Sequence, residues 1–319
     1  MSCIVIKARI HCGLNQIIIN QISITMNKLK CSVILAAIGL IASGCSIKQD
    51  RSFCTAPISV HIHNFQIEQG DISQTKAPTG VANYSDLKAL TLAFYNSNGA
   101  EQYKWTQIKE DTSTYETFGE FSCSLPYGAY TMVAVGYYYN PDQPFELTSP
   151  TQAAFTGDRS YETFVSTQSF TVSDSDPLNI YSTLERINTC LRVISTDGKA
   201  ADVKKVRMTL SKGGKAFNPT TGLATVNTGF SNSVSVSAAA GSVSNSLTLF
   251  FLASDEDTMD VTIETLNEAQ EVLFSTTVNN VPFKRNRQTL LRGSMYSANT
   301  TVSGLQLDPD MLDGITVNF

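Results

Sequence analysis

The feature that most constrains the fold of this chain is an alternation of apolar and polar side chains in many short segments. In "PISVHI" the apolar set is Ile58, Val60 and Ile62, and "VKKVRMTL" repeats the pattern. Successive side chains of a strand point to opposite faces, so this period predicts strands with one buried face. The best helical candidate, "IYSTLERINT", is weak, and no window of a dozen residues carries a convincing helical period.

Further strand-like segments follow one another along the chain, separated by polar or glycine-containing turns. They are "LKALTLAFY", "LPYGAYTMVAVGYYYN", "SLTLFFLAS", "MDVTIETL" and "EVLFSTTV". After Ile62 the apolar positions change parity to Phe65 and Ile67, which predicts a bulge near Asn64. Short strands with frequent turns must bury one face against a second sheet, so we expect an all-β sandwich architecture.

The beginning of the chain reads as an export signal. From Met26, "MNKLK" supplies positive charge, residues 31–41 are apolar, and "ASG" precedes Cys45. About eleven apolar residues suit a signal-peptide core and fall short of the ~20 needed to span a bilayer. We therefore interpret residues 1–44 as presequence and signal peptide, with the true start at Met26 and residues 1–25 better explained by a misassigned start codon.

The cleavage region resembles the lipobox of bacterial lipoproteins. This resemblance implies that Cys45 becomes the first residue and carries lipid, with palmitate as one acyl chain. Ala42 departs from the pattern, because Leu, Val or Ile usually occupies that position. The alternative is ordinary cleavage after Gly44, which leaves a free thiol. Residues 45–55 are polar and predict a tether between the lipid and the first domain.

Roughly 275 residues follow the cysteine, which is comfortable for two domains of ordinary size. We predict an N-terminal β-sandwich over 56–185 and a C-terminal β-sandwich over 186–319. Charged residues make up 16% of the chain and the net charge is -5, which argues against nucleic acid or an anionic membrane face as partner. Of the cysteines beyond the presequence, Cys54, Cys123 and Cys190 are too scattered for a disulfide framework, although one bridge is an alternative to single buried thiols.

The residues that usually carry catalysis are scarce. Only His61 and His63 lie beyond the presequence, and they share one face of the first strand. They could bind a metal together, but no cysteine or carboxylate is spaced nearby to complete a ligand set, so an exposed polar face is the preferred interpretation. The sequence thus predicts no enzyme, no metal and no cofactor.

The sequence offers two other kinds of candidate ligand site. The acidic clusters Ser173–Asp176 and Ser254–Asp257 lack the spacing of a calcium loop and read as solvated turns. The aromatic run Tyr137–Tyr139 and the single Trp105 could make a sugar-stacking platform, whereas strand tyrosines more often lie half in the core.

Several segments, in order, resemble the Bacteroidales fimbrillin superfamily of FimA-type and FimB-type fimbrial subunit lipoproteins. The lipobox is followed by a first strand ending in Phe65, a strand and polar turn, a "LxxGxY"-like strand entry, and a segment similar to the family's "VPLKRNxxTxLxG". In this chain the last three read "LKALTLAFYNSNGAEQ", "LPYGAYTMVAVG" and "VPFKRNRQTLLRGSMY", and "LERINTCLRV" resembles an interdomain strand. The resemblance covers nearly the whole chain after Cys45.

This resemblance implies two tandem transthyretin-like β-sandwich domains in a lipid-anchored protein of the cell outer membrane. Its partners would be other fimbrial subunits, joined by β-strand donation, and host or bacterial surface ligands in adhesion. The alternative is a glycan-binding outer-membrane lipoprotein of a nutrient-uptake system, which is also all-β and lipidated.

Two chain segments bear on the assembly role that the resemblance implies. In the family's stalk members an arginine-specific protease cuts the loop after the first strand, but here "DISQTKAPTG" offers Lys76 and no arginine. We therefore expect the first strand to stay in place, as in an anchor-like member, with Lys76 as a site for a protease of other specificity. At the chain's end, Ile315, Val317 and Phe319 alternate with polar residues and form a candidate donor strand, which can equally close its own sheet.

Overall fold

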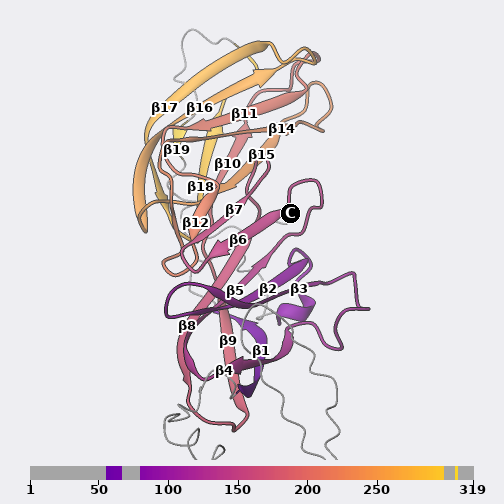
Figure 1. The fold of residues 1–319 in the computed structure, drawn as a ribbon. Helices are drawn as coiled ribbons and strands as arrows, with labels where there is room; N and C mark the ends of the chain where they lie inside the picture. Colours follow the sequence, from indigo (N-terminus) through magenta and orange to yellow (C-terminus); the bar gives the residue numbers. More distant parts are fainter. Residues whose placement is uncertain (1–54, 67–79, 298–305, 308–319) are drawn as a thin grey trace, which may run out of the picture. The chain divides into compact units, whose positions relative to one another are not determined.

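The computed structural model describes residues 55–66, 80–297 and 306–307, all of which belong to one compact unit of the chain. Figure 1 shows that this part consists of strands, with one short 3-10 helix, η2 (Val81–Asn83). The predicted all-β class is confirmed. Within the described residues, no helix has the length and apolar character needed to cross a membrane.

The first sheet contains seven strands in the order β3-β2-β5-β8-β9-β1-β4. Its strands are β1 (Thr55–Phe65), β2 (Ala89–Asn96), β3 (Glu101–Ile108), β4 (Glu120–Pro126), β5 (Gly128–Tyr137), β8 (Thr163–Val172) and β9 (Leu178–Arg186). Strands β8 and β9 pair only at their ends, through Phe164 and Val165. One core cluster takes apolar side chains from β1, β4 and β9 and from β2, β5 and β8. The sheet therefore folds over at the β8–β9 junction into two layers around this core.

The predicted faces agree with this core. Ile58, Val60 and Ile62 are almost fully buried in it, and Leu90 and Leu92 contribute from β2. The register of β1 against β9 shifts between Ile62 and Asn64, so the predicted bulge is confirmed. The weak helical candidate is wrong: its first seven residues lie in β9, where buried and more exposed residues alternate.

Two further sheets of four strands each follow along the chain. One has the order β15-β10-β18-β19 and the other the order β14-β11-β16-β17. Their bounds are β10 (Thr189–Ser195), β11 (Lys205–Leu210), β14 (Phe230–Ser235), β15 (Asn245–Phe250), β16 (Glu256–Leu266), β17 (Val272–Lys284), β18 (Gln288–Gly293) and β19 (Gln306–Leu307). Val206, Met208 and Leu210 of β11 pack in one cluster with Leu191 and Leu291 from the facing sheet. The sandwich architecture is thereby confirmed.

A small fourth sheet mixes strands from both halves of the chain. Its order is β13-β12-β7-β6, formed by β6 (Phe145–Ser149), β7 (Gln152–Phe155), β12 (Ala216–Asn218) and β13 (Leu223–Ala224). Phe217 pairs with Ala153 across this sheet and packs on Phe251 and Phe145, at ring-centre distances of 4.6 and 6.1 Å. The sequence division at 185/186 stays a prediction, because strands from both sides of it share this sheet and its core.

A buried polar cluster lies at the end of β9. A guanidinium nitrogen of Arg186 lies 2.5 Å from the Glu162 carboxylate, and the Tyr84 hydroxyl donates to the same carboxylate at 2.9 and 3.0 Å. Burial raises the pKa of Glu162, and the neighbouring Arg186 opposes that rise. The guanidinium also stacks over the Phe164 ring, 4.9 Å from its centre. These contacts offset the free-energy cost of burying the two charges inside the fold.

Candidate functional site

The feature that best defines a candidate site is the position of β1 inside the sheet. It pairs with β9 in parallel from Ile58 to Phe65 and with β4 antiparallel from Thr55 to His61. The first strand thus lies between two others in the strand order of the sheet. Its loss would leave the facing N–H and C=O groups of β4 and β9 without their strand partner.

The side chains of β1 make the same space apolar. Ala56, Ile58, Val60 and Ile62 are each only 1% exposed. They belong to the same cluster as buried side chains of the neighbouring strands, which are Phe121, Leu125, Ile180 and Leu184. A strand that occupies this position therefore needs apolar residues at every second place, and the β1 position is a candidate strand-exchange site.

The other residues of the assembly hypothesis lie outside the described part of the chain. These are the lipidation site Cys45, the processing candidate Lys76, and the donor-strand residues Ile315, Val317 and Phe319. Cys54 is also outside it. Their roles stay predictions.

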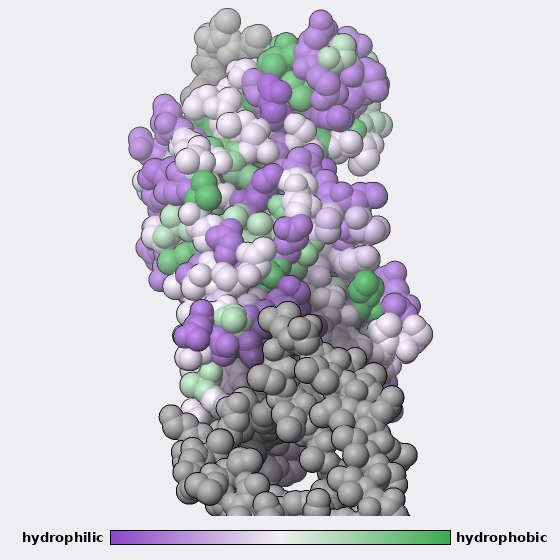
Figure 2. Space-filling view, viewed as in Figure 1, coloured by the Kyte–Doolittle hydropathy of each residue, from purple (hydrophilic) through white to green (hydrophobic). Residues whose placement is uncertain are grey.

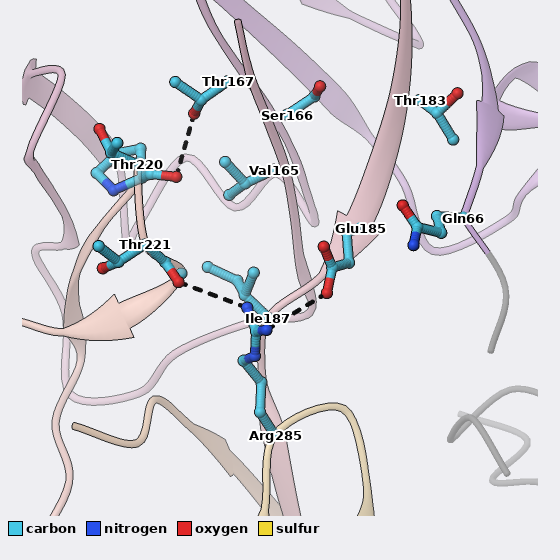
Figure 3. Close-up of a pocket in the computed structure, with 12 residues that line it drawn as sticks. Gln66, Val165, Ser166, Thr167, Thr183, Glu185, Ile187, Thr220, Thr221 and Arg285 are labelled. Carbon is cyan, nitrogen blue, oxygen red and sulfur yellow. Dashed lines mark hydrogen bonds and ion pairs between the residues drawn. The ribbon is translucent and has the colours of Figure 1, made fainter. Parts of the chain in front are cut away.

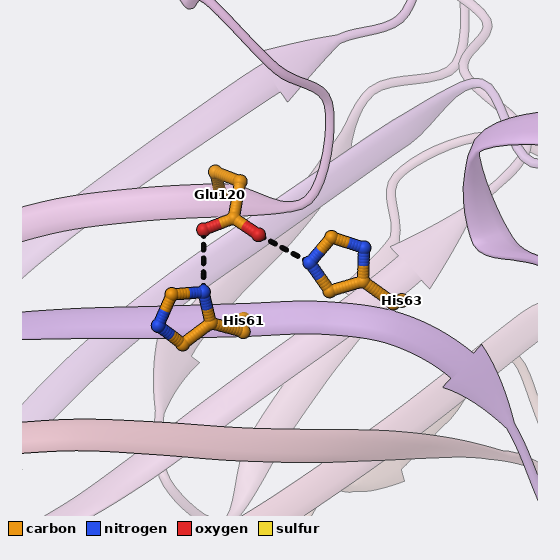
Figure 4. A group of neighbouring side chains, drawn as sticks. All are labelled: His61, His63 and Glu120. Carbon is orange, nitrogen blue, oxygen red and sulfur yellow. Dashed lines mark hydrogen bonds and ion pairs between the residues drawn. The ribbon is translucent and has the colours of Figure 1, made fainter.

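The structure brings together a cluster that the sequence did not reveal (Figure 4). Glu120 of β4 lies opposite His61 in the strand register, and its carboxylate contacts both imidazoles of β1. The distance from His61 Nδ1 to Glu120 Oε2 is 2.6 Å, and His63 Nε2 contacts Glu120 Oε1. The expectation that no carboxylate lies near the two histidines is wrong, because Glu120 is remote in sequence and only the β1–β4 register places it there.

Gly119 explains how β4 comes so close to β1 at this point. Its φ is +95°, a conformation that residues with a side chain rarely adopt, and its carbonyl accepts the Ile62 N–H at 2.9 Å. A Cβ at this position would lie 2.4 Å from the Ile62 carbonyl oxygen. The glycine therefore permits the close approach that places the next residue, Glu120, beside the histidines.

A polar cleft of about 230 Å³ lies where β8 and β9 separate (Figure 3). Its two charged lining residues, Glu185 and Arg285, lie 3.6 Å apart, and Arg285 also donates to the Thr221 carbonyl at 3.5 Å. Thr167 donates to the Pro219 carbonyl across the same cleft at 3.2 Å. These interactions hold the segments around the cleft together. Because the two charged residues already pair with each other, the cleft offers no uncompensated charge to a ligand.

The aromatic candidates do not form a shared platform. Tyr137 is buried in a core, whereas Tyr138 is 37% exposed and stacks on Tyr161 with ring centres 5.3 Å apart. Trp105 is exposed on β3 and makes no ring contact within the described residues. On the face shown in Figure 2, hydrophobic residues are scattered among hydrophilic ones. The expected division of strand tyrosines between core and surface agrees with this arrangement.

The acidic residues of one cluster form ion pairs, and the other cluster forms a hydrogen-bonded turn. Asp255, Glu256 and Asp257 each pair with a separate cation, namely Arg285, Lys284 and Lys212. In the other cluster, Asp174 accepts the Asp176 N–H at 3.1 Å, as in a turn.

Cys123 and Cys190 have free thiols, and burial raises their pKa to about 11 and about 12. Both thiols therefore stay protonated and unreactive near neutral pH.

Comparison with solved structures identifies the class of fold. A protein described as a "putative adhesin" from Bacteroides ovatus matches with a TM-score of 0.50 and 10% identity, over 86% of this chain and 97% of that chain. The fimbrial anchor protein Mfa2 from Porphyromonas gingivalis matches with a TM-score of 0.47 and 11% identity, over 80% and 95%. "Putative polysaccharide binding proteins" from Bacteroides thetaiotaomicron match with a TM-score of 0.44 and 9% identity, over 75% and 92%.

The chain therefore shares its fold with the Bacteroides ovatus protein described as a "putative adhesin", which agrees with the sequence resemblance. Residues 58–316 match the model of a family described as "Family of unknown function (DUF6562)", and the chain belongs to that family. No curated protein matches the sequence.

Proposed function

We propose that this chain is a cell-surface lipoprotein subunit of a fimbria, in an anchor or accessory position, that assembles by β-strand exchange and supports adhesion. The observation that carries the proposal is the insertion of β1 between β4 and β9, with its apolar face fully buried. The sequence resemblance to fimbrial subunits and the fold shared with the Bacteroides ovatus protein described as a "putative adhesin" support it. No catalytic step is part of this function.

Strand exchange follows from backbone chemistry. A strand in the β1 position forms ladders on both sides, and its alternate side chains fill the core below. Because this chain offers no arginine in the loop after β1, we propose that β1 stays in place. Its own strand position is then filled, so the subunit ends or anchors a fibre and the open position belongs to the neighbouring subunit. The segment it lends to a neighbour is then the C-terminal strand with Ile315, Val317 and Phe319.

The test is to change the candidate donor strand by parity. Val317→Asp should abolish or reduce at least tenfold the co-purification of other fimbrial subunits, because a charge would enter the neighbour's apolar core. Asn318→Asp adds the same charge on the opposite face of the strand and is the matched control. It should leave the partners bound.

Thermal melting of both variants separates lending from closure of the chain's own sheet. Unchanged melting with partner loss only in Val317→Asp supports lending. A lower melting temperature for Val317→Asp, or equal partner binding by the two variants, would contradict it.

The lipid anchor is tested separately. Cys45→Ala should move the protein from the membrane fraction to the soluble fraction, because two acyl chains hold a protein firmly whereas one binds only marginally. Cys54→Ala is the matched control and should stay in the membrane fraction. Continued membrane association of Cys45→Ala would disprove lipidation at this cysteine and the proposed outer-membrane anchoring with it.

A further inference from the structure

The cluster of His61, His63 and Glu120 has the composition of a metal site. Its three candidate ligand atoms lie within 4.8 Å of one another, and each residue offers one nitrogen or oxygen. The two imidazoles point to the same carboxylate from one face of β1, as Figure 4 shows. Imidazole nitrogen and carboxylate oxygen are ligands that Zn²⁺ accepts, and three protein ligands leave a fourth tetrahedral position for water.

The surroundings of His61 orient its ring for this role. Its Nε2 lies 3.4 Å from the Asn179 side-chain oxygen of β9, and the Tyr181 ring stacks on it at 4.7 Å. A hydrogen on Nε2, donated to that amide oxygen, leaves the lone pair on Nδ1, the atom that faces Glu120. Metal-binding histidines typically have such a partner on the second nitrogen, which fixes the tautomer.

Exposure at the site suits an ion with a water ligand. The exposed fractions of the side chains are 22% for His61, 50% for His63 and 33% for Glu120. Solvent therefore reaches the open side of the cluster, while β1 and β4 fix the other side. The negative charge of the Glu120 carboxylate attracts the ion, and the two imidazole nitrogens add coordination bonds.

We propose that His61, His63 and Glu120 bind a divalent transition-metal ion of the zinc type, which ties β1 to β4. Two ligands come from β1 and the third from β4, so the complete site exists only while β1 occupies its place in the sheet. By linkage, an ion that binds this state and not the state without β1 stabilises the docked strand. The ion thus acts as a clamp on the first strand, independent of the assembly role of the subunit.

Titration calorimetry of the complete chain in detergent with ZnCl₂, at pH 7.5 and without chelators, tests the site. We expect the unmodified chain to bind Zn²⁺, and His63→Ala and Glu120→Gln each to lower the affinity by at least roughly 10- to 100-fold. Loss of a residue that only supports a ligand costs that much, and these two variants remove a ligand itself. Glu101→Gln removes an exposed carboxylate on β3 and is the matched control, with unchanged affinity. No binding to the unmodified chain, or equal binding by all three variants, would overturn the proposal.

Hydrogen exchange of the β1 amides tests the clamp. Zn²⁺ should slow their exchange in the unmodified chain and in Glu101→Gln, and should have no effect in His63→Ala. His63 is half exposed, so this variant should fold normally, and its melting without metal confirms that. Zinc binding that leaves β1 exchange unchanged would contradict the clamp.

Discussion

Replacing Arg186 with methionine should lower the free energy of unfolding by about 3–5 kcal/mol, the range found when one partner of a buried ion pair is removed. Arg186 and Glu162 are both buried, and the guanidinium also covers the Phe164 ring. Methionine keeps much of the apolar volume but removes the positive charge beside the Glu162 carboxylate. The Tyr84 hydroxyl still donates a hydrogen bond to that carboxylate. Urea unfolding at pH 7 measures the loss.

A matched control shows that burial causes this effect. Arg207→Met breaks an ion pair with Glu264 that is partly exposed, and exposed pairs are worth about 0–1 kcal/mol. Adding Glu162→Gln to Arg186→Met should restore part of the stability, since it removes the unpaired buried charge. If Arg186→Met is no less stable than Arg207→Met, the buried pair does not stabilise the fold as argued.

The same variant should have a characteristic pH dependence. Burial raises the pKa of Glu162 in the folded protein, and loss of Arg186 should raise it further. A carboxyl whose folded pKa exceeds its unfolded value destabilises the fold as pH rises through that window. The deficit of Arg186→Met relative to the unmodified chain should therefore be smaller near pH 4 than at pH 7.

The sequence predicted local structure wherever side-chain periodicity determines it. Ile58, Val60 and Ile62 are buried as their alternation indicates, and the parity change after them marks a real bulge. The segment from Ile180 has only a weak helical pattern, and its first seven residues lie in strand β9.

The candidate site depends on pairings that no local pattern contains. Glu120 meets His61 only because β4 pairs with β1 in one register, which a shift of one residue would destroy. The insertion of β1 between β4 and β9 likewise combines residues from distant parts of the chain. Such contacts result from the pairing and packing of whole strands. The local sequence feature that accompanies them is Gly119, which permits the close approach of β4 to β1.

Removing β1 should have the largest effect of any change to the first sheet. Burying one Val or Ile side chain contributes roughly 1.5–3 kcal/mol, so Ile58, Val60 and Ile62 together contribute roughly 5–9 kcal/mol. That is comparable to the whole net stability of an ordinary domain, about 5–15 kcal/mol. A chain that begins at Ala77, as cleavage after Lys76 would produce, should therefore lose the cooperative unfolding of its first sheet.

A peptide with the sequence of Thr55–Phe65 should restore that transition when added in trans, because it supplies both ladders and the apolar face. The same peptide with Val60→Asp should fail, whereas Ser59→Asp, which places the charge on the opposite face, should still work. Circular dichroism melting with increasing peptide concentration measures the rescue. If the chain from Ala77 melts like the complete protein, or if both altered peptides rescue equally, the β1 position is not a strand-exchange site. Rescue that depends on parity would show that this position accepts a strand from outside the chain, which is the physical step that assembly by strand exchange requires.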